Sequence, residues 1–424
     1  MAALGASPLG GIDTFVVTED AELLTAGHDG PVMRIALVPT GVAGGRARVF
    51  MAVAGHSHCA AVSEKGDVFT WGDNDYGALG VGAAHTLLYI PVTHIPRTVF
   101  GDRPIMQVAL GMDHSLALSV DGTVYTAGCG GEGQLGHGER ANVLLFTRVA
   151  ALAAVRVVFV AAGLRMSTMI GDGDVFTCGH GPNGELGLGG ILDGDLGLGN
   201  LDDRLLPTRL PTFGVAPTVF VSVGLHAVAV QADESMWVWG QNRYGQLGLG
   251  DVEDRARPTV VPFHPVVTAA CGIKHTLVLT KARLVYSCGR GTLGPLADGA
   301  ASNGLVLARV EGMPFAVSVS AGYGVRSAAV TAGGLLYMWN GWAAPVPRPL
   351  DARAGRFNHL LPEPSSVAVA MGVHTRLGEV SPLRVLPDCV VRRLIESCTS
   401  WPSGPAGAFE GLARLLGGGV FDAA

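Results

Sequence analysis

Lysine is scarce in this 424-residue chain, since only Lys65, Lys274 and Lys281 among its 29 basic residues are lysines. No stretch of the sequence is a run of Lys and Arg, and the net charge is −6. A nucleic-acid binder usually carries a basic patch or a basic run. Its absence argues against nucleic-acid or nucleosome binding and favours a protein partner.

Cysteine motifs and long apolar runs are also missing. The seven cysteines are an odd number and include no C-x-x-C pair, which argues against a disulfide framework or a zinc site. No apolar stretch reaches 18 residues, and the N-terminus lacks a basic segment followed by an apolar one. The sequence predicts an intracellular protein, cytoplasmic rather than nuclear, with no signal peptide or transmembrane segment.

What the sequence does contain is a repeat. A phrase recurs at intervals of 49 to 60 residues: Gly-x-x-His, an apolar stretch, a turn, and a strand that ends in Trp-Gly. A period of this length is typical of propellers and solenoids. The position that begins each unit, the His column, holds His58, His114, Met166, His226, His275, Val325 and His374. The position that ends each hairpin, the Trp column, holds Ala26, Trp71, Ala127, Cys178, Trp239, Cys288 and Trp339.

The two ends of the chain carry complementary half units. Ala26 has no His column before it, and His374 has no Trp column after it. Pairing of 15–27 with 366–371 would close a ring, whereas an open solenoid would need polar caps. The sequence therefore predicts an all-β fold, a seven-bladed β-propeller over residues 14–376 with a split closing blade. The predicted blades cover about 49–98, 105–150, 155–210, 219–262, 266–309, 316–350, and 366–376 together with 14–40.

Glycine marks the turns within each unit. Asp121-Gly122 and Asp172-Gly173 suit two-residue hairpin loops, in which both positions take positive φ. A phrase such as Gly133-Gln-Leu-Gly136 follows most copies of the Trp column. It comes after antiparallel hairpins, whereas a dinucleotide-binding loop joins a strand to a helix. We therefore interpret it as structural.

These motifs resemble those of a known family. Gly-x-x-His, Asp-Gly-x-Val-Tyr-x-Trp-Gly and Gly-Gln-Leu-Gly-x-Gly are similar to the repeats of the regulator of chromosome condensation family, over roughly residues 14–376. The resemblance implies a seven-bladed β-propeller. The founding members are guanine nucleotide exchange factors for the small GTPase Ran, in which acidic residues beside the His column act on the GTPase. The matching positions here are Ser57, Asp113, Arg165, Leu225, Lys274, Gly324 and Val373, and only Asp113 is acidic.

The candidate site residues divide into repeat columns and charged loop positions. The histidines His58, His114, His226, His275 and His374 would lie around a ring and not converge on one ion, so we predict no metal site, no cofactor and no catalytic residue. We interpret them as half-buried side chains that bond backbone groups of their own blade, and Trp71, Trp239 and Trp339 as structural. The candidate partner-binding residues are Asp113, Arg165, Lys274, Arg204 and Arg255.

Residues 381–424 follow the repeats and differ from them. A segment that begins at Leu386-Pro387-Asp388 has apolar residues on one helical face, and a second amphipathic stretch follows Pro405. We predict a short α-helical C-terminal extension. Its opening resembles the start of an F-box, whose family partner is a ubiquitin-ligase adaptor. The alternative is a helical hairpin that seals the ring.

The sequence favours a non-enzymatic scaffold that binds a protein partner through one face of the propeller. The repeat alignment leaves no nucleophile–base pair, carboxylate pair or ligand cluster. Two alternatives stay open. One is a guanine nucleotide exchange factor for a Ran-like small GTPase, and the other is a substrate-recruiting subunit of a ubiquitin ligase that uses the F-box-like segment.

Overall fold

The structure is a computed structural model. It describes residues 14–17, 23–26, 33–35, 47–82, 90–182, 185–188, 202–291, 296, 302–322, 327–331, 335–340, 344–349 and 368–370. Residues 14–17, 23–26, 33–35, 336, 338, 340, 344–349 and 368–370 are described by their backbone alone.

One sheet shows how a repeat unit folds. Strands β8 (Ile105–Leu110), β9 (His114–Ser119), β10 (Val124–Gly128) and β11 (Val143–Arg148) pair antiparallel in the order of the chain. All of β9 and β10 is buried, whereas most of β11 is partly or fully exposed. Successive side chains of a strand point to opposite faces, so a strand buried throughout is covered on both faces. Strands β9 and β10 are thus packed between neighbouring sheets, and β11 is an outer edge.

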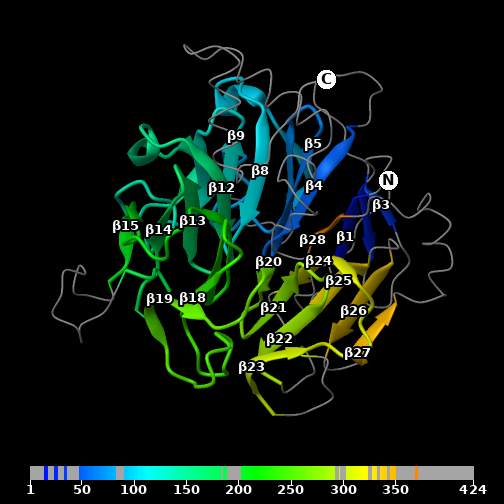
Figure 1. The fold of residues 1–424 in the computed structure, drawn as a ribbon. Coiled ribbons are helices and arrows are strands. Elements are labelled where there is room, and N and C mark those ends of the chain that lie inside the picture. Colours follow the sequence, from blue (N-terminus) through cyan, green and yellow to red (C-terminus); the bar gives the residue numbers. More distant parts are fainter. Residues whose placement is uncertain are drawn as a thin grey trace, which may run out of the picture.

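Five of the other described sheets repeat this order, and the last one takes its first strand from the far end of the chain. Figure 1 shows the sheets standing side by side around a common centre, with the fourth strands on the rim. The strands of these other sheets are β4 (Val49–Ala54), β5 (His58–Ser63), β6 (Val68–Gly72) and β7 (Ile90–Ile95); β12 (Val157–Ala162), β13 (Met166–Gly171), β14 (Asp174–Gly179) and β15 (Arg204–Arg209); β16 (Thr218–Val223), β17 (His226–Gln231), β18 (Met236–Gly240) and β19 (Arg255–Val261); β20 (Val266–Cys271), β21 (His275–Thr280), β22 (Val285–Gly289) and β23 (Gly304–Arg309); β24 (Ala316–Ala321), β25 (Ser327–Thr331), β26 (Leu336–Asn340) and β27 (Ala344–Pro349); and β1 (Thr14–Val17), β2 (Leu23–Ala26), β3 (Met33–Ile35) and β28 (Ala368–Ala370). The described part also has two short 3-10 helices, η1 (Arg97–Phe100) and η2 (Ala150–Leu152). No helix among the described residues is long and apolar enough to cross a membrane.

The last sheet joins strands from the two ends of the chain. Strand β1 pairs with β28 through Phe15↔Ala370, Val16↔Val369 and Val17↔Ala368, and with β2 on its other side. Such pairing joins the two ends of the chain and closes the array into a ring. The all-β class and the β-propeller architecture are confirmed. The blade boundaries stay predictions, and the helical extension over 381–424 lies outside the described residues.

The hairpin turns differ from one another in their backbone. Asp172 and Gly173 both take positive φ, at 54° and 84°, as predicted. At Asp121-Gly122 only Gly122 does, at 87°. The amide of Ser119 bonds the carbonyl of Thr123 there, and the Ser119 hydroxyl bonds the Asp121 carboxylate. The two-residue turn predicted at Asp121-Gly122 is therefore wrong, because this hairpin closes around a longer loop.

The His column lies at the junctions between sheets. Its described histidines are at most 1% exposed, and each Nε2 contacts a hydroxyl oxygen in the next sheet. The contacts are His58–Ser115 (2.9 Å), His114–Ser167 (3.0 Å), His226–Thr276 (2.6 Å) and His275–Ser327 (3.0 Å). The predicted half-buried histidine with backbone partners in its own blade is therefore wrong. The second strand of each sheet is covered on both faces, so its side chains reach the neighbouring sheet.

The hydroxyl groups fix the tautomer of the imidazoles. Three of them donate back to carbonyl oxygens of the preceding sheet: Ser115 to Ala78 (2.6 Å), Ser167 to Gln134 (2.7 Å) and Thr276 to Gln246 (2.6 Å). A hydroxyl has one proton to donate. Nε2 must therefore carry the proton at these junctions and donate it to the hydroxyl oxygen. The imidazole of one sheet thus donates to a hydroxyl of the next sheet. That hydroxyl in turn donates to a carbonyl in the Gly-rich phrase of the first sheet.

Burial also fixes the charge of these rings. Loss of hydration lowers the pKa of His58 and His275 to about 4, and that of His114 and His226 to about 3. The junction imidazoles are therefore neutral donors at neutral pH.

One junction lacks both partners of the usual pair. The His column holds Met166 in the third unit, and the position that supplies the hydroxyl in the next sheet is Ala227. Both side chains are buried, at 2% and 0% exposure. Replacing both partners of a buried hydrogen bond by apolar groups is far less costly than removing one, because no polar group is left unpaired.

This comparison predicts that mutations at the junction of His114 and Ser167 change the unfolding free energy non-additively. Ser167→Ala removes the acceptor of a buried N–H and should cost about 1–3 kcal/mol of unfolding free energy. The double variant His114→Met/Ser167→Ala copies the Met166–Ala227 junction and should cost less than the sum of its single variants. Urea denaturation measures the unfolding free energy of Ser167→Ala, of His114→Met and of the double variant. Additive losses would contradict the pairing of His114 with Ser167.

Candidate partner-binding face

One face of the propeller is formed by the loops that follow the first and third strands of each sheet. In an antiparallel sheet these loops lie at the same edge. A backbone amide joins each pair of loops: Asp73 to Ser57 (3.0 Å), Cys129 to Asp113 (2.8 Å), His180 to Arg165 (2.9 Å), Gln241 to Leu225 (3.2 Å) and Arg290 to Lys274 (2.8 Å). We call these ten residues and their surroundings the loop face. It brings three of the predicted residues, Asp113, Arg165 and Lys274, onto one side of the molecule.

The first two sheets make the loop face acidic. Asp73, Asp75 and Asp113 lie close enough to interact electrostatically. Burial is the main cause that raises the pKa of Asp113, and the charges of Asp73 and Asp75 raise it further, while His56 and Arg165 oppose the shift. Asp113 is therefore a partly desolvated carboxyl with two further carboxylates, Asp73 and Asp75, and two basic side chains, His56 and Arg165, around it.

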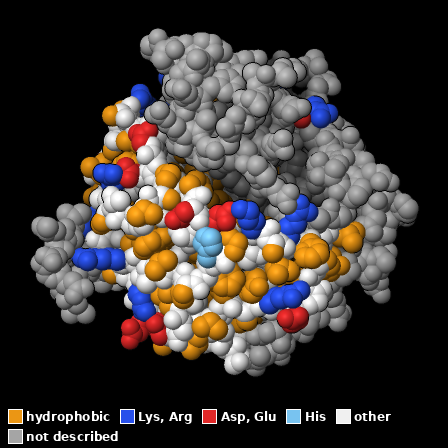
Figure 2. Space-filling view, viewed as in Figure 1, with side chains coloured by type: hydrophobic (Ala, Val, Ile, Leu, Met, Phe, Trp, Pro, Cys, Tyr) orange, Lys and Arg blue, Asp and Glu red, His pale blue; other side chains and the backbone are white. Residues whose placement is uncertain are grey.

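The junction of the second and third sheets carries charges of both signs. Arg165 Nη1 lies 2.8 Å from Glu132 Oε1, and Arg140 Nη1 lies 2.9 Å from Asp203 Oδ2. His180 Nδ1 is 3.4 Å from Asp203 Oδ1. Opposite charges pair across the sheets here, so Arg165 already has an acidic neighbour. In the view of Figure 2, acidic, basic and histidine side chains gather near the middle of the described surface, among hydrophobic ones.

The fifth sheet makes the loop face basic. Lys274 Nζ lies 5.1 Å from the centre of the Tyr244 ring, and the Arg290 guanidinium lies 5.5 Å from it. Both distances are within the range of cation–π attraction. A tyrosine of one sheet thus holds two cations of the next.

Tyr244 and Glu132 hold the same position of the repeat, just before the Gly-Gln-Leu-Gly phrase. Each reaches the two loop-face residues of the next sheet. In the first unit this position is Tyr76, and the matching residues of the next sheet are Asp113 and Cys129. Tyr76 is 46% exposed. Tyr76, Glu132 and Tyr244 were not among the predicted partner-binding residues, although each stands just before the first glycine of the Gly-rich phrase.

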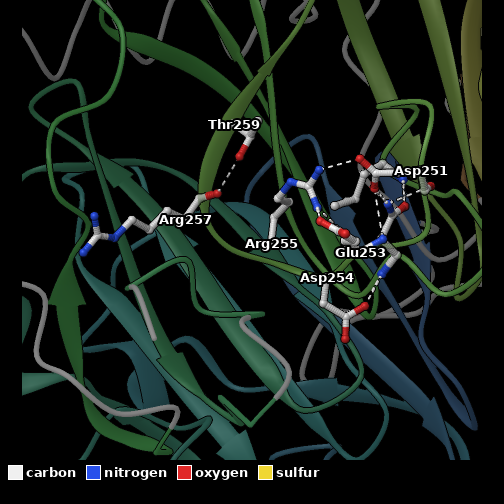
Figure 3. Close-up of polar contacts among 8 residues, drawn as sticks. Asp251, Glu253, Asp254, Arg255, Arg257 and Thr259 are labelled. Carbon is white, nitrogen blue, oxygen red and sulfur yellow. Dashed lines mark hydrogen bonds and ion pairs between the residues drawn. The ribbon is translucent and has the colours of Figure 1, made fainter. Parts of the chain in front are cut away.

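Arg204 and Arg255 lie at the same edge of their sheets as the loop face, on its outer side. They begin the outer strands β15 and β19, opposite Gly179 and Gly240. Figure 3 shows that Arg255 points back into its own loop, where Nη2 lies 2.6 Å from Asp251 Oδ2 and Nη1 bonds the Glu253 carbonyl at 2.8 Å. Arg255 therefore stabilises its loop.

Asn242 is the centre of that loop. It is fully buried, and its side chain donates to Asp251 at 2.9 Å and accepts from the Leu247 amide at 3.0 Å. Its own amide donates to Asp254 at 2.7 Å. The charged residues of 251–255 thus serve mainly to fix the strand connection in place.

Within the described residues no group of three His, Cys, Asp or Glu side chains could hold a metal ion. Burial raises the pKa of Cys178, Cys271 and Cys288 to about 12, so these thiols are unreactive. The titratable groups with the largest shifts are buried at sheet junctions, not in a cleft. The described part of the loop face is thus a charged surface.

The fold and this surface define a repeat-built β-propeller that presents its charges on loops. The chain belongs to the RCC1-like domain family, whose model matches residues 27–344. The resemblance drawn from the motifs is thereby confirmed.

Relatives and solved structures agree with that assignment. The chain is 33% identical to the ultraviolet-B receptor UVR8 of Arabidopsis thaliana over 259 residues, 59% of this chain and 55% of that protein. It is 31% identical to the human regulator of chromosome condensation over 270 residues, 59% of this chain and 62% of that protein. The matches thus span less than two thirds of either relative.

The structure of human WBSCR16 is similar with a TM-score of 0.65 at 22% identity, covering 85% of this chain and 99% of that one. Prp20p of Saccharomyces cerevisiae is similar with a TM-score of 0.64 at 22% identity, covering 92% and 95%. Both likenesses show the fold.

The contacts of the 251–255 loop predict an order of mutational effects. Asn242→Ala leaves several buried groups unpaired and should lower the unfolding free energy by about 2 kcal/mol or more. Arg255→Ala removes a partly exposed ion pair and should cost less than about 1 kcal/mol. Chemical denaturation compares the two, and the reverse order would show that the ion pair holds the loop.

Proposed function

We propose that this protein is a non-enzymatic scaffold that binds a protein partner through the loop face. The observation that carries the proposal is the contrast between two equivalent tyrosines. Tyr244 is covered by the cations Lys274 and Arg290 of the next sheet, whereas Tyr76 is 46% exposed and faces a sheet whose matching residues are Asp113 and Cys129.

This contrast specifies the chemistry of the partner. A Lys or Arg side chain of the partner placed at Tyr76 would find an aromatic ring together with Asp73, Asp75 and Asp113. Cation–π attraction is worth about 0.5–2 kcal/mol and grows as water is excluded. Tyrosine is one of the residue types enriched among the hot spots of protein interfaces. The acidic side of the loop face therefore suits a basic segment of the partner.

The basic side of the loop face orients the same partner. Lys274 and Arg290 lie on the fifth sheet, away from the acids of the first two. A face divided into areas of opposite charge steers and aligns a partner with the complementary division. Nucleic acid is a poor match, because the acidic area would repel phosphates.

Nucleotide exchange on a Ran-like small GTPase is the second candidate. The human regulator of chromosome condensation is a relative. The structural neighbour Prp20p was characterised for its binding to Gsp1p and histones. Asp113 is the residue that favours this candidate, since it holds the acidic position beside the His column. Recruitment to a ubiquitin ligase through 381–424 is the third candidate and rests on the F-box-like sequence alone.

Charge reversal tests the scaffold proposal. The full chain is used for affinity capture with quantitative mass spectrometry, as wild type, Asp73→Lys/Asp113→Lys and Tyr76→Ala. Glu311→Lys is the matched control, because this exposed residue follows β23 at the opposite edge of its sheet. Partners of the loop face should fall at least about tenfold with both face variants, the loss expected for a hot spot of 1.4 kcal/mol or more. Equal capture by all variants would contradict the proposal.

Two further assays separate the alternatives. Accelerated nucleotide release from a Ran-like GTPase, abolished by Asp113→Asn, would establish exchange activity in place of a passive scaffold. Adaptor binding that is lost when residues 381–424 are deleted would establish the ubiquitin-ligase candidate.

A further inference from the structure

The junction with Met166 and Ala227 opens into a pocket on the loop face. The pocket has a volume of about 220 Å³. Its apolar lining comes from Leu164, Met166 and Leu225, and its polar lining from Arg165, His180 and Gln241. Two sheets thus contribute to it, the third and the fourth.

Two departures from the repeat account for this pocket. At the place of Met166 the first, second and fifth sheets have His58, His114 and His275, and each of these rings lies against the loop glycine of its sheet. The loop between β16 and β17 is also one residue shorter than its counterparts, with Gly224 and Leu225 alone between the strands. A flexible thioether and a shortened loop replace an imidazole ring and one residue.

The size of the pocket limits what it can hold. A water molecule occupies about 30 Å³ in the liquid, so the volume equals roughly seven waters. Sites for drug-sized ligands and cofactors begin at about 300 Å³. The pocket is therefore suited to a single amino-acid side chain.

The charges around the pocket limit the type of side chain. Arg165 lies 2.8 Å from Glu132, so the guanidinium on the wall is already paired. Glu185, which also lines the pocket, is 3% exposed and already takes part in another polar or electrostatic interaction. A charged occupant would lose hydration without gaining an unpaired counter-charge. The apolar wall favours an uncharged occupant.

We propose that this pocket receives one uncharged aliphatic side chain, of the size of leucine, from the protein that binds the loop face. The proposal rests on the proposed function for its biological partner. It adds a hydrophobic anchor at the junction of the third and fourth sheets, beside the charged areas that orient the partner. An aromatic or aliphatic side chain seated in a pocket is a common centre of a binding interface.

The methyl group of Met166 is a built-in reporter. The full chain is labelled with 13C at the methionine methyl groups, and Met166→Leu assigns the resonance. The probe is N-acetyl-leucinamide, which at its size should bind with a dissociation constant of about 2 mM if the pocket fits. It should shift the Met166 signal saturably and leave that of Met51 in the first sheet unchanged. N-acetyl-lysinamide, matched in backbone, should leave both signals unchanged.

Variants separate the pocket from general surface effects. Leu225→Trp fills the pocket and should abolish the saturable shift, whereas Ser57→Trp, the equivalent position of the first sheet, should leave it intact. The Met51 signal reports that each variant is folded. A Met166 signal unmoved by leucinamide, or moved equally by lysinamide, would overturn the proposal. The titration uses no protein partner, so its failure is distinct from a failed capture by the loop face.

Discussion

The hydrogen bond between an imidazole of one sheet and a hydroxyl of the next is the constraint on which the rest of the propeller depends. It places a neutral ring at the junctions formed by His58, His114, His226 and His275, and the rings of His114 and His275 leave no space for a side chain on the loop beside them. A Cβ at Gly111 would lie 2.1 Å from His114 Cε1, and one at Gly272 would lie 2.4 Å from His275 Cε1. The residue just before the histidine is thereby held on the loop face. The same motif that joins the sheets also positions Asp113 and Lys274.

The recurrence of Gly, His and Trp was enough to predict the propeller, because each unit buries its second and third strands in the same way. The partners of the histidines could not be predicted in this manner. Ser115 and Thr276 follow the His column by one residue in a different unit, and only the packing of sheets brings them to His58 and His226. The sequence shows that Met166 replaces the histidine and Ala227 the hydroxyl residue. Only the contact between the two positions in the structure explains why both are replaced together.

The charged residues were the least predictable part. Arg255 and Arg165 have the same chemistry, yet Arg255 closes its own loop while Arg165 pairs across sheets. Tyr76, Glu132 and Tyr244 share one position of the repeat but differ in type, so a motif search does not select them. Their contacts depend on how far a side chain reaches into the next sheet. Departures from the repeat therefore give the loop face its varied charges, whereas the residues that the units share maintain the fold.

The state of the junction histidines is tested most directly by 15N NMR of the imidazole nitrogens, recorded as the pH is lowered from about 7.5 to about 5, across the ordinary range of histidine titration. Burial with pKa values of about 3 to 4 predicts that His58, His114, His226 and His275 stay neutral throughout. Nε2 of His58, His114 and His226 should be protonated, and Nδ1 of the same three rings should be unprotonated. Protonation of the four rings near pH 6.5, or a proton on Nδ1 of His58, His114 or His226, would contradict the bonded junctions from which the fold and the loop face have been derived.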